Sequence, residues 1–204
     1  MAKLEVPPTK SSLLSLQRSL EFAQEGYELL EQKRQILVLE LMSRLEAAKR
    51  AQKDVDAAMA AAFAALREAA LRSGTEALAR EALGIVRHHK LDYRGRPVMG
   101  IDLPTVTAEH EAPKPEFSTA SGSAASDDVM ARFTQALDAL ARLAEVENAV
   151  LRLASEVRRT QRRVNALDKV FIPDYQETVN YIEDVLEERE REQFVIMKMA
   201  KGQA

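Results

Sequence analysis

The sequence contains no cysteine and no tryptophan, and it has only seven glycines and seven prolines among its 204 residues. Without cysteine the chain can form no disulfide, no thiolate metal site and no cysteine nucleophile, which fits a reducing compartment. So few glycines and prolines leave little material for the many turns of an all-β fold. Aromatic residues make up only 5% of the chain, so the bulky residues that usually fill a compact core are scarce. We therefore expect a helical protein.

Charge and hydropathy exclude two further classes. The formal net charge is -3, with 30% charged residues, whereas nucleic-acid-binding domains usually carry a strongly basic face. The longest apolar run, Ala57 to Leu66, is far shorter than the ~20 residues needed to cross a bilayer, and residues 1–10 lack the apolar stretch of a signal peptide. We expect a protein that is soluble or peripheral to a membrane and binds no nucleic acid.

Apolar residues recur at alternating steps of three and four over the first third of the chain, and we call these positions the first seam. They are Leu13, Leu16, Leu20, Ala23, Tyr27, Leu30, Arg34, Leu37, Leu41, Arg44, Ala48, Ala51, Val55, Ala58, Ala62, Ala65 and Ala69. Fifteen of the seventeen are apolar, and no proline occurs between Pro8 and Pro97. A seam sustained over this length predicts a coiled-coil helix, with Thr9 or Ser11 as its cap.

The last third repeats the pattern, and we call its positions the second seam. They are Leu143, Val146, Val150, Leu153, Val157, Thr160, Val164, Leu167 and Phe171, followed one residue further on by Ile172, Tyr175, Val179, Ile182, Leu186, Arg189, Gln193, Ile196 and Ala200. The one-residue shift predicts a local adjustment of the supercoil, and Pro173 should bend the helix there. Ser126, Asp127 and Asp128 are expected to form the amino-terminal cap and first turn of this helix.

Length decides the expected architecture. Leu13 to Ala69 as one helix would be ~85 Å long and Val129 to Lys201 ~110 Å, whereas a compact chain of this size has a radius of gyration of only ~17 Å. We therefore predict an elongated all-α fold in which the two helices form a long antiparallel coiled coil. Matching the helix lengths places Leu13 near Ile196.

The middle of the chain differs from both ends. A short helix is expected near residues 75–83, followed by two short strands, Ile85 to Tyr93 and Val98 to Leu103, about a turn at Arg94 to Pro97. Pro104 to Asp128 contains a Ser/Ala/Gly run and is expected to be a flexible linker. The predicted organisation is a first long helix (1–72), a tip with a short helix, β-hairpin and linker (73–128), and a second long helix (129–204).

Catalytic motifs are missing from this layout. The sequence has neither GxxxxGK[ST] nor GxGxxG to cradle a nucleotide phosphate. His88 and His89 are adjacent, and on a strand they would point to opposite faces, so we interpret them as solvated residues and not as metal ligands. The basic run Arg158 to Arg163 is followed by Glu187 to Glu192, which favours the charged outer face of a coiled coil over a nucleic-acid site. We expect no catalytic, cofactor-binding or metal-binding residues.

Three stretches resemble one known family. RRTQRRVNALDKVFIP with TVNYIEDVLEERERE, between Arg158 and Glu192, resembles the carboxyl-terminal signature of the D subunit of the V-type and A-type rotary ATPases and ATP synthases. PTKSSLLSLQRSLEFAQEGYELLEQKRQILVLE, Pro8 to Glu40, is similar to the other end of that family, and Val98 to Pro104 to its middle strand. The three matches occur in the family's order and together cover the length of the chain.

The resemblance implies a noncatalytic central rotor shaft, a counterpart of the γ subunit of other rotary ATPases. In the family, the two helix ends stand inside a hexamer of catalytic A and noncatalytic B subunits, a small F subunit binds the side of the shaft, and a funnel-shaped C (or d) subunit on the membrane ring holds its lower end. The protein would then lie at the cytoplasmic face of the membrane and contact it only indirectly. Two alternatives are a non-rotary coiled-coil adaptor or tether and a helical accessory arm of a nucleic-acid enzyme.

Candidate partner-binding residues follow from the same resemblance. Those expected to contact the A/B hexamer and the F subunit are Gly26, Lys33, Arg34, Arg158, Arg159, Arg162, Arg163, Asn165, Glu187, Glu188, Arg189 and Arg191. Those expected at the lower tip are Tyr93, Met99 and Ile101. Gly26 costs about 1 kcal/mol relative to alanine in a helix, so it marks either a close approach of another chain or of the second helix, or a tolerated surface glycine. A shaft turning inside a ring should carry charged, hydrated faces in preference to an exposed apolar patch.

Overall fold

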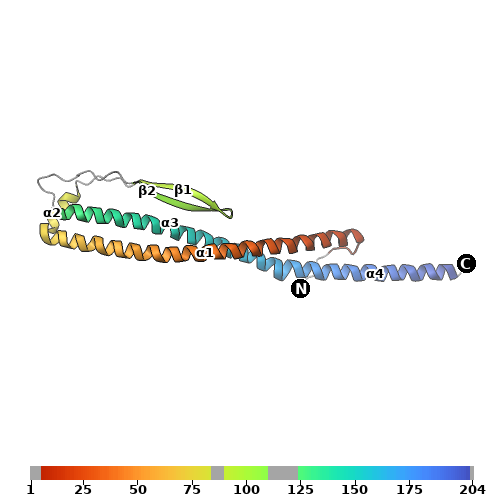
Figure 1. Cartoon of the computed structure of the whole chain (residues 1–204). Coiled ribbons are helices and arrows are strands. Elements are labelled where there is room, and N and C mark those ends of the chain that lie inside the picture. Colours follow the sequence, from red (N-terminus) through yellow and green to blue (C-terminus); the bar gives the residue numbers. More distant parts are fainter. Residues whose placement is uncertain (1–5, 84–89, 110–123, 203–204) are drawn as a thin grey trace. The chain divides into compact units, whose positions relative to one another are not determined.

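The computed structural model describes residues 6–83, 90–109 and 124–202. The elements in chain order are α1 (Lys10–Ser73), α2 (Thr75–Ala82), β1 (Lys90–Val98), β2 (Ile101–Glu109), α3 (Ala124–Ala166), the π-helical turn η1 (Leu167–Phe171) and α4 (Ile172–Gly202) (Figure 1). Long helices and one two-stranded antiparallel sheet confirm the predicted fold class. By its contacts the chain divides into two compact units, unit 1 (residues 1–36 and 157–204) and unit 2 (residues 37–156).

Helix α1 begins and is buried as its sequence predicts. Thr9 is the cap: its Oγ1 accepts a hydrogen bond from the Ser12 backbone N–H (3.2 Å), and its carbonyl accepts one from the Leu13 N–H (2.9 Å). Gly74 ends the helix with φ +82°, the left-handed conformation that glycine adopts most easily. The buried residues of α1 all belong to the first seam: Leu16, Ala23, Leu37, Val55, Ala62 and Ala69. The three-four spacing therefore identified the correct face of this helix.

In unit 1, the start of α1 packs against α4 in the antiparallel direction. Leu16, Val179 and Ile182 form a buried cluster, and Leu13 and Leu186 pack against it. Ile182 is completely buried, whereas Ile196 is 64% exposed. The placement of Leu13 beside Ile196 was therefore wrong by about ten residues, because helix lengths alone do not say where two helices begin to overlap.

Polar contacts support the same alignment of the two helices. Lys10 Nζ lies 2.7 Å from Glu190 Oε1, and Gln17 Nε2 donates to Glu183 Oε1 (2.9 Å). Both pairs join α1 to the part of α4 that follows the buried Ile182. The start of α1 is thus opposite Glu190, and α4 continues past it, as the red and blue helices of Figure 1 show.

The π-helical turn η1 stands where the second seam shifts by one residue. The Ile172 backbone N–H bonds to the carbonyl of Leu167, five residues earlier, in place of the usual four. A π turn holds one more residue than an α turn, so the local adjustment predicted for this stretch is an inserted residue. The bend expected at Pro173, the residue that follows Ile172, stays a prediction.

The hairpin of unit 2 has a different turn from the expected one. Val98 pairs with Ile101 across the two-residue turn Met99–Gly100, so Arg94 to Pro97 lie inside β1. Met99 (φ +51°) and Gly100 (φ +79°) both have positive φ, as a type I′ turn requires. The expected turn was wrong because Arg-Gly-Arg-Pro has turn composition, whereas methionine at positive φ gives no such signal.

The prolines of the hairpin cost no ladder hydrogen bond. Pairs alternate between hydrogen-bonded and non-hydrogen-bonded, starting from the bonded Val98–Ile101 pair beside the turn. Pro97 and Pro104 then fall on non-hydrogen-bonded pairs, opposite Asp102 and Gly95. Because strand β2 runs to Glu109, the expected linker beginning at Pro104 was wrong for its first six residues. The rest of that linker to residue 123, the strand start at Ile85, and His88 and His89 lie outside the described residues.

Helix α3 holds the outer edge of β2. The Val106 N–H bonds to Glu145 Oε2 (3.0 Å), and Arg152 Nη1 donates to the Asp102 carbonyl (2.5 Å). Arg152 Nη2 also donates to the Tyr93 hydroxyl (3.0 Å). Glu145 and Arg152 are two turns apart on α3 and face the strand together. Two side chains of α3 therefore position the hairpin, and the pattern of residues within the strands does not predict these contacts.

The short helix α2 packs at the start of α3. It spans Thr75–Ala82, close to the expected 75–83. Helix α3 begins at Ala124, two residues before the expected cap, so Ser126 lies inside the first turn. The Ser126 hydroxyl is buried there and donates to Glu81 Oε2 of α2 (2.5 Å). The expected cap was therefore wrong, because Ser126 lies inside the helix and its hydroxyl bonds to another helix.

Candidate partner-binding surface

An apolar groove of about 860 Å³ lies in unit 1, between α1 and the stretch that contains η1. Its lining residues are Ser11, Leu14, Ser15, Arg18, Ser19, Phe22, Ala23, Gly26, Leu30, Leu167, Phe171 and Tyr175. Three large apolar side chains in it are strongly exposed: Phe22 (77%), Leu14 (56%) and Phe171 (48%). Arg18 is the one charged lining residue. Exposed apolar side chains gathered in one concave surface are typical of a protein-binding site.

The groove opens where the helix pair loses its buried core. Residues 165–177, all of them described, include no buried residue, although Val164 and Thr178 on either side are buried. On α1, the buried Ala23 and the small Gly26 face this stretch in the groove. The interhelical packing is therefore weakest beside η1, which leaves Phe22 and Phe171 accessible.

Gly26 is the one predicted contact residue in the groove. A Cβ atom added there would meet no other group of this chain within 4 Å. The second helix therefore does not require a glycine at this position. Of the interpretations given above, close approach by the second helix is excluded, whereas approach by another chain and a tolerated glycine both stay open.

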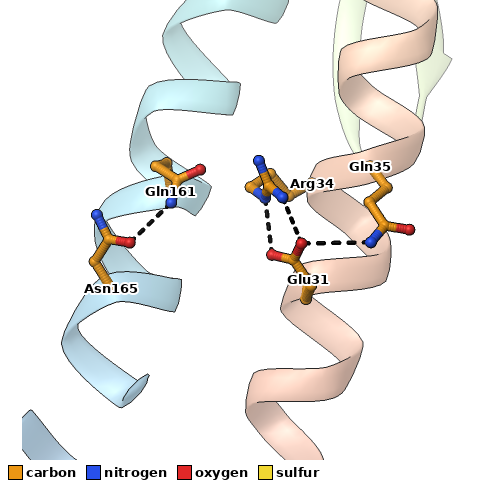
Figure 2. A network of polar contacts seen from close by, with 5 residues as sticks. All are labelled: Glu31, Arg34, Gln35, Gln161 and Asn165. Carbon is orange, nitrogen blue, oxygen red and sulfur yellow. Dashed lines mark hydrogen bonds and ion pairs between the residues drawn. The ribbon is translucent and has the colours of Figure 1, made fainter. Parts of the chain in front are cut away.

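Arg34 of the first seam is neutralised within its own helix. Its Nε donates to Glu31 Oε2 (2.8 Å), and its Nη2 forms a second bond to Glu31 Oε1, which Gln35 also contacts at 3.4 Å. These bonds hold the pKa of Glu31 below its ordinary value and raise that of Arg34. Figure 2 shows Arg34 pointing toward the stretch of α3 in which Gln161 donates to Asn165 Oδ1 (2.8 Å). Both side chains of the ion pair are half-buried, with Arg34 30% and Glu31 24% exposed.

The basic run of α3 lies on the solvated side of the helix. The four predicted contact residues Arg158, Arg159, Arg162 and Arg163 are on this side, as is Asn165, while Thr160 and Val164 between them are buried. All five of these side chains are exposed. Lys33 on α1 is half-buried and lies off the buried face of that helix. The expected charged outer face of a coiled coil is confirmed, and the arginines stand together on it as a cationic surface.

The acidic and basic run near the end of α4 is an exposed network. Arg191 bonds to Glu187 (2.5 Å) and to Glu188 (3.2 Å), which raises the pKa of Arg191. Arg189 instead donates to the carbonyl of Pro8 (3.0 Å) and so fastens the segment that precedes α1. Surface pairs of this kind contribute little stability, so the run is chiefly a hydrated surface.

Beyond that network lies an apolar surface that the sequence interpretation did not single out. We call it the apolar end of α4, and its strongly exposed side chains are Phe194, Val195, Ile196, Met197 and Met199, between 49% and 66% exposed. Helix α1 begins opposite Glu190, so the helix pair ends before this stretch. The expectation of purely charged surfaces was wrong here. The composition FVIMKM after a charged run was the available signal, but periodicity assigned Ile196 to the seam.

The residues expected at the lower tip belong to the hairpin. Met99 forms the turn and is 44% exposed, and Tyr93 is 57% exposed with its hydroxyl held by Arg152. Ile101 is half-buried at the start of β2. They lie in unit 2, and the other predicted contact residues lie in unit 1.

Within the described residues the chain has neither a metal-binding cluster nor a membrane-spanning helix. In that part of the chain no three His, Asp or Glu side chains gather in a way that would hold a metal ion. Over the same residues no helix combines the length and apolarity needed to span a membrane.

These features define a class. The chain is a helical coiled-coil protein whose candidate sites are surfaces for other macromolecules: an apolar groove, a cationic face and an apolar helix end. Comparison with known proteins gives the family. Residues 12–202 match the family of the ATP synthase D subunit, and the chain belongs to it.

Relatives match over almost their whole length. The V-type ATP synthase D subunit of Thermotoga neapolitana is 36% identical over 198 residues, which cover 97% of this chain and 98% of the relative. The A-type ATP synthase D subunit of Thermococcus gammatolerans is 35% identical over 202 residues, covering 98% and 94%. A V-type ATP synthase D subunit of Treponema pallidum is 38% identical over 200 residues, covering 98% and 96%.

Proposed function

We propose that this protein is the central-stalk rotor component of a V/A-type rotary ATPase or ATP synthase. It transmits torque between the catalytic A/B hexamer and the ion-translocating ring in the membrane, and it catalyses no reaction itself. Family membership supports its place in such a complex. The observation that carries the rotor role is the apolar end of α4, which extends past the start of α1 with large apolar side chains in solvent.

The physical argument concerns what such an end can contact. Exposed contiguous apolar side chains on a soluble surface are unfavourable unless another surface covers them. A protruding helix end fits a central opening in a ring of subunits, and the charged network of Glu187 to Arg191 below it stays hydrated. We propose that the apolar end turns against the inner surface of the A/B hexamer.

The remaining partners are assigned to the other surfaces. The groove beside η1 and the cationic face of α3 are proposed to contact the hexamer and the F subunit. The hairpin with Tyr93, Met99 and Ile101 is proposed to meet the funnel-shaped C (or d) subunit, so that membrane contact is indirect, at the cytoplasmic face.

Substitutions at the apolar end of α4, compared with a substitution of an exposed leucine elsewhere, test whether this particular surface is needed. Phe194→Ser with Ile196→Ser should lower ATP hydrolysis by a reconstituted complex of the A, B and F subunits with this chain by at least about tenfold, if the lost contacts amount to about 1.4 kcal/mol of coupling. Leu71→Ser, which removes an 83% exposed leucine of unit 2, is the matched control. Because this soluble complex lacks the membrane ring, the control should retain full activity. Equal activity of all three complexes would contradict the role of the apolar end.

Rotation itself distinguishes a rotor from an adaptor. A bead attached near Tyr93 should turn when ATP is added to the surface-fixed hexamer. A non-rotary tether would bind the same subunits but leave the bead still, and ATP hydrolysis would not depend on the presence of the chain.

A further inference from the structure

The second seam contains one step that is too long. From Val157 to Leu167 its positions advance by three, four and three residues, and from Ile172 to Leu186 by three, four, three and four. From Leu167 to Ile172 the advance is five residues, because Phe171 follows at the regular step of four and the seam then moves on by one to Ile172. An α-helix would rotate every later seam position by about 100° after such a step. The α4 side chains nevertheless pack on α1, because η1 absorbs the extra residue.

This accommodation weakens the packing near it. Val170 and Phe171, inside η1, are 50% and 48% exposed. No buried residue occurs in residues 165–177, and the groove opens beside them. A chain with one residue fewer here would have an uninterrupted seam from Val157 to Leu186. The surplus residue thus has a local cost in packing.

Pro173 follows the π turn directly. Proline has no backbone N–H, and inside a regular α-helix its ring clashes with the carbonyl four residues earlier, here that of Lys169. The wider π turn moves the preceding carbonyls away from the positions they take in an α-helix. The turn therefore makes room for the proline, and the proline removes the N–H that a regular turn would use.

We infer that η1 and Pro173 form a single hinge in the second long helix, in which the surplus residue and the proline each make the other tolerable. Either feature alone would be a defect, whereas together they form a defined flexible joint between α3 and α4. Its use during rotation rests on the proposed function, but its existence does not.

A double-mutant cycle on the full-length isolated chain tests the coupling. Deletion of Val170 alone should lower Tm by about 3 to 8 °C, because Pro173 then falls inside a continuous α-helix. Pro173→Ala alone should shift Tm by less than about 3 °C, because the surplus residue keeps the π turn. The double variant should melt about 2 to 4 °C above the wild type, because an unbroken seam repacks residues 165–177.

The inference requires that Pro173→Ala reverse the loss of Tm caused by deletion of Val170. A double variant whose Tm shift equals the sum of the two single shifts would overturn it, as would stabilisation by the deletion alone. Deletion of Arg159, an exposed residue in the regular part of α3, is the control. It should destabilise the chain equally with and without Pro173→Ala, because it rotates the following seam positions off α1.

Hydrogen exchange locates the hinge. The amides of residues 170–174 should exchange at least about tenfold faster than those of residues 178–182 in the wild type, and the difference should vanish in the double variant. Uniform protection across both stretches in the wild type would contradict a hinge. In the reconstituted complex, lower ATP turnover by the double variant at equal incorporation would support a role in rotation, and unchanged turnover would overturn that role.

Discussion

Ile182 and Ile196 provide a direct test of where the antiparallel helix pair ends. Both lie on α4 and on the second seam, but Ile182 is completely buried in the cluster with Leu16 and Val179, whereas Ile196 is 64% exposed. Replacing isoleucine by alanine removes three carbons, at about 0.8 kcal/mol for each buried methylene. A cavity adds to this cost, although a two-helix interface can partly collapse. We therefore expect Ile182→Ala to lower the free energy of unfolding by about 2 to 3 kcal/mol.

Thermal unfolding followed by circular dichroism at 222 nm measures this loss. For a chain of this size, about 2 to 3 kcal/mol corresponds to a fall in Tm of about 5 to 10 °C. Ile196→Ala is the matched control on the same helix, with an expected change within about 0.5 kcal/mol. Equal losses in the two variants would refute the alignment of α1 with α4, because both isoleucines would then be packed.

Three further outcomes follow from single contacts. Gly26→Ala should raise the Tm of the isolated chain by about 2 to 4 °C, because alanine is favoured by about 1 kcal/mol in a helix and its Cβ meets nothing in this chain; an unchanged or lower Tm would contradict the open surroundings. Met99→Asn should slow hydrogen exchange of the hairpin amides, because asparagine before Gly100 suits the type I′ turn; faster exchange would argue against that turn. The hydrogen bond from Lys10 lowers the pKa of Glu190 below its ordinary 4.5, so the Tm difference between wild type and Glu190→Gln should be present at pH 7 and lost as pH falls through the lowered pKa. A difference that persists at lower pH would exclude the ion pair as its cause.

Sequence periodicity predicted the parts of this fold that depend on one helix face. Every buried residue of α1 lies on the first seam, from Leu16 to Ala69. The one-residue shift after Phe171 was also visible in the sequence, and it corresponds to η1. Both signals are local, because each turn of a paired helix must present an apolar residue to its partner.

Contacts between distant segments explain the errors. Glu145 and Arg152 hold β2 from α3, and no pattern within residues 90–109 reveals these contacts. Serine is a residue type that is common at helix caps, but the Ser126 hydroxyl bonds to Glu81 of a different helix. Ile196 continues the seam spacing, yet the helix pair ends before it, because periodicity describes one helix and not the end of its partner.

Large apolar side chains are exposed both in the groove beside η1 and at the apolar end of α4. A coiled coil that served only to hold itself together would fill the groove beside η1 and replace the apolar end of α4 with polar residues, since both changes favour stability and solubility. Phe22, Phe171 and Phe194 instead remain exposed at 77%, 48% and 65%. The intervening run of α4, from Glu187 to Arg191, is charged and internally paired. If the proposed rotor function is correct, these two apolar surfaces are where the chain contacts its neighbours, and the charged segment between them stays hydrated.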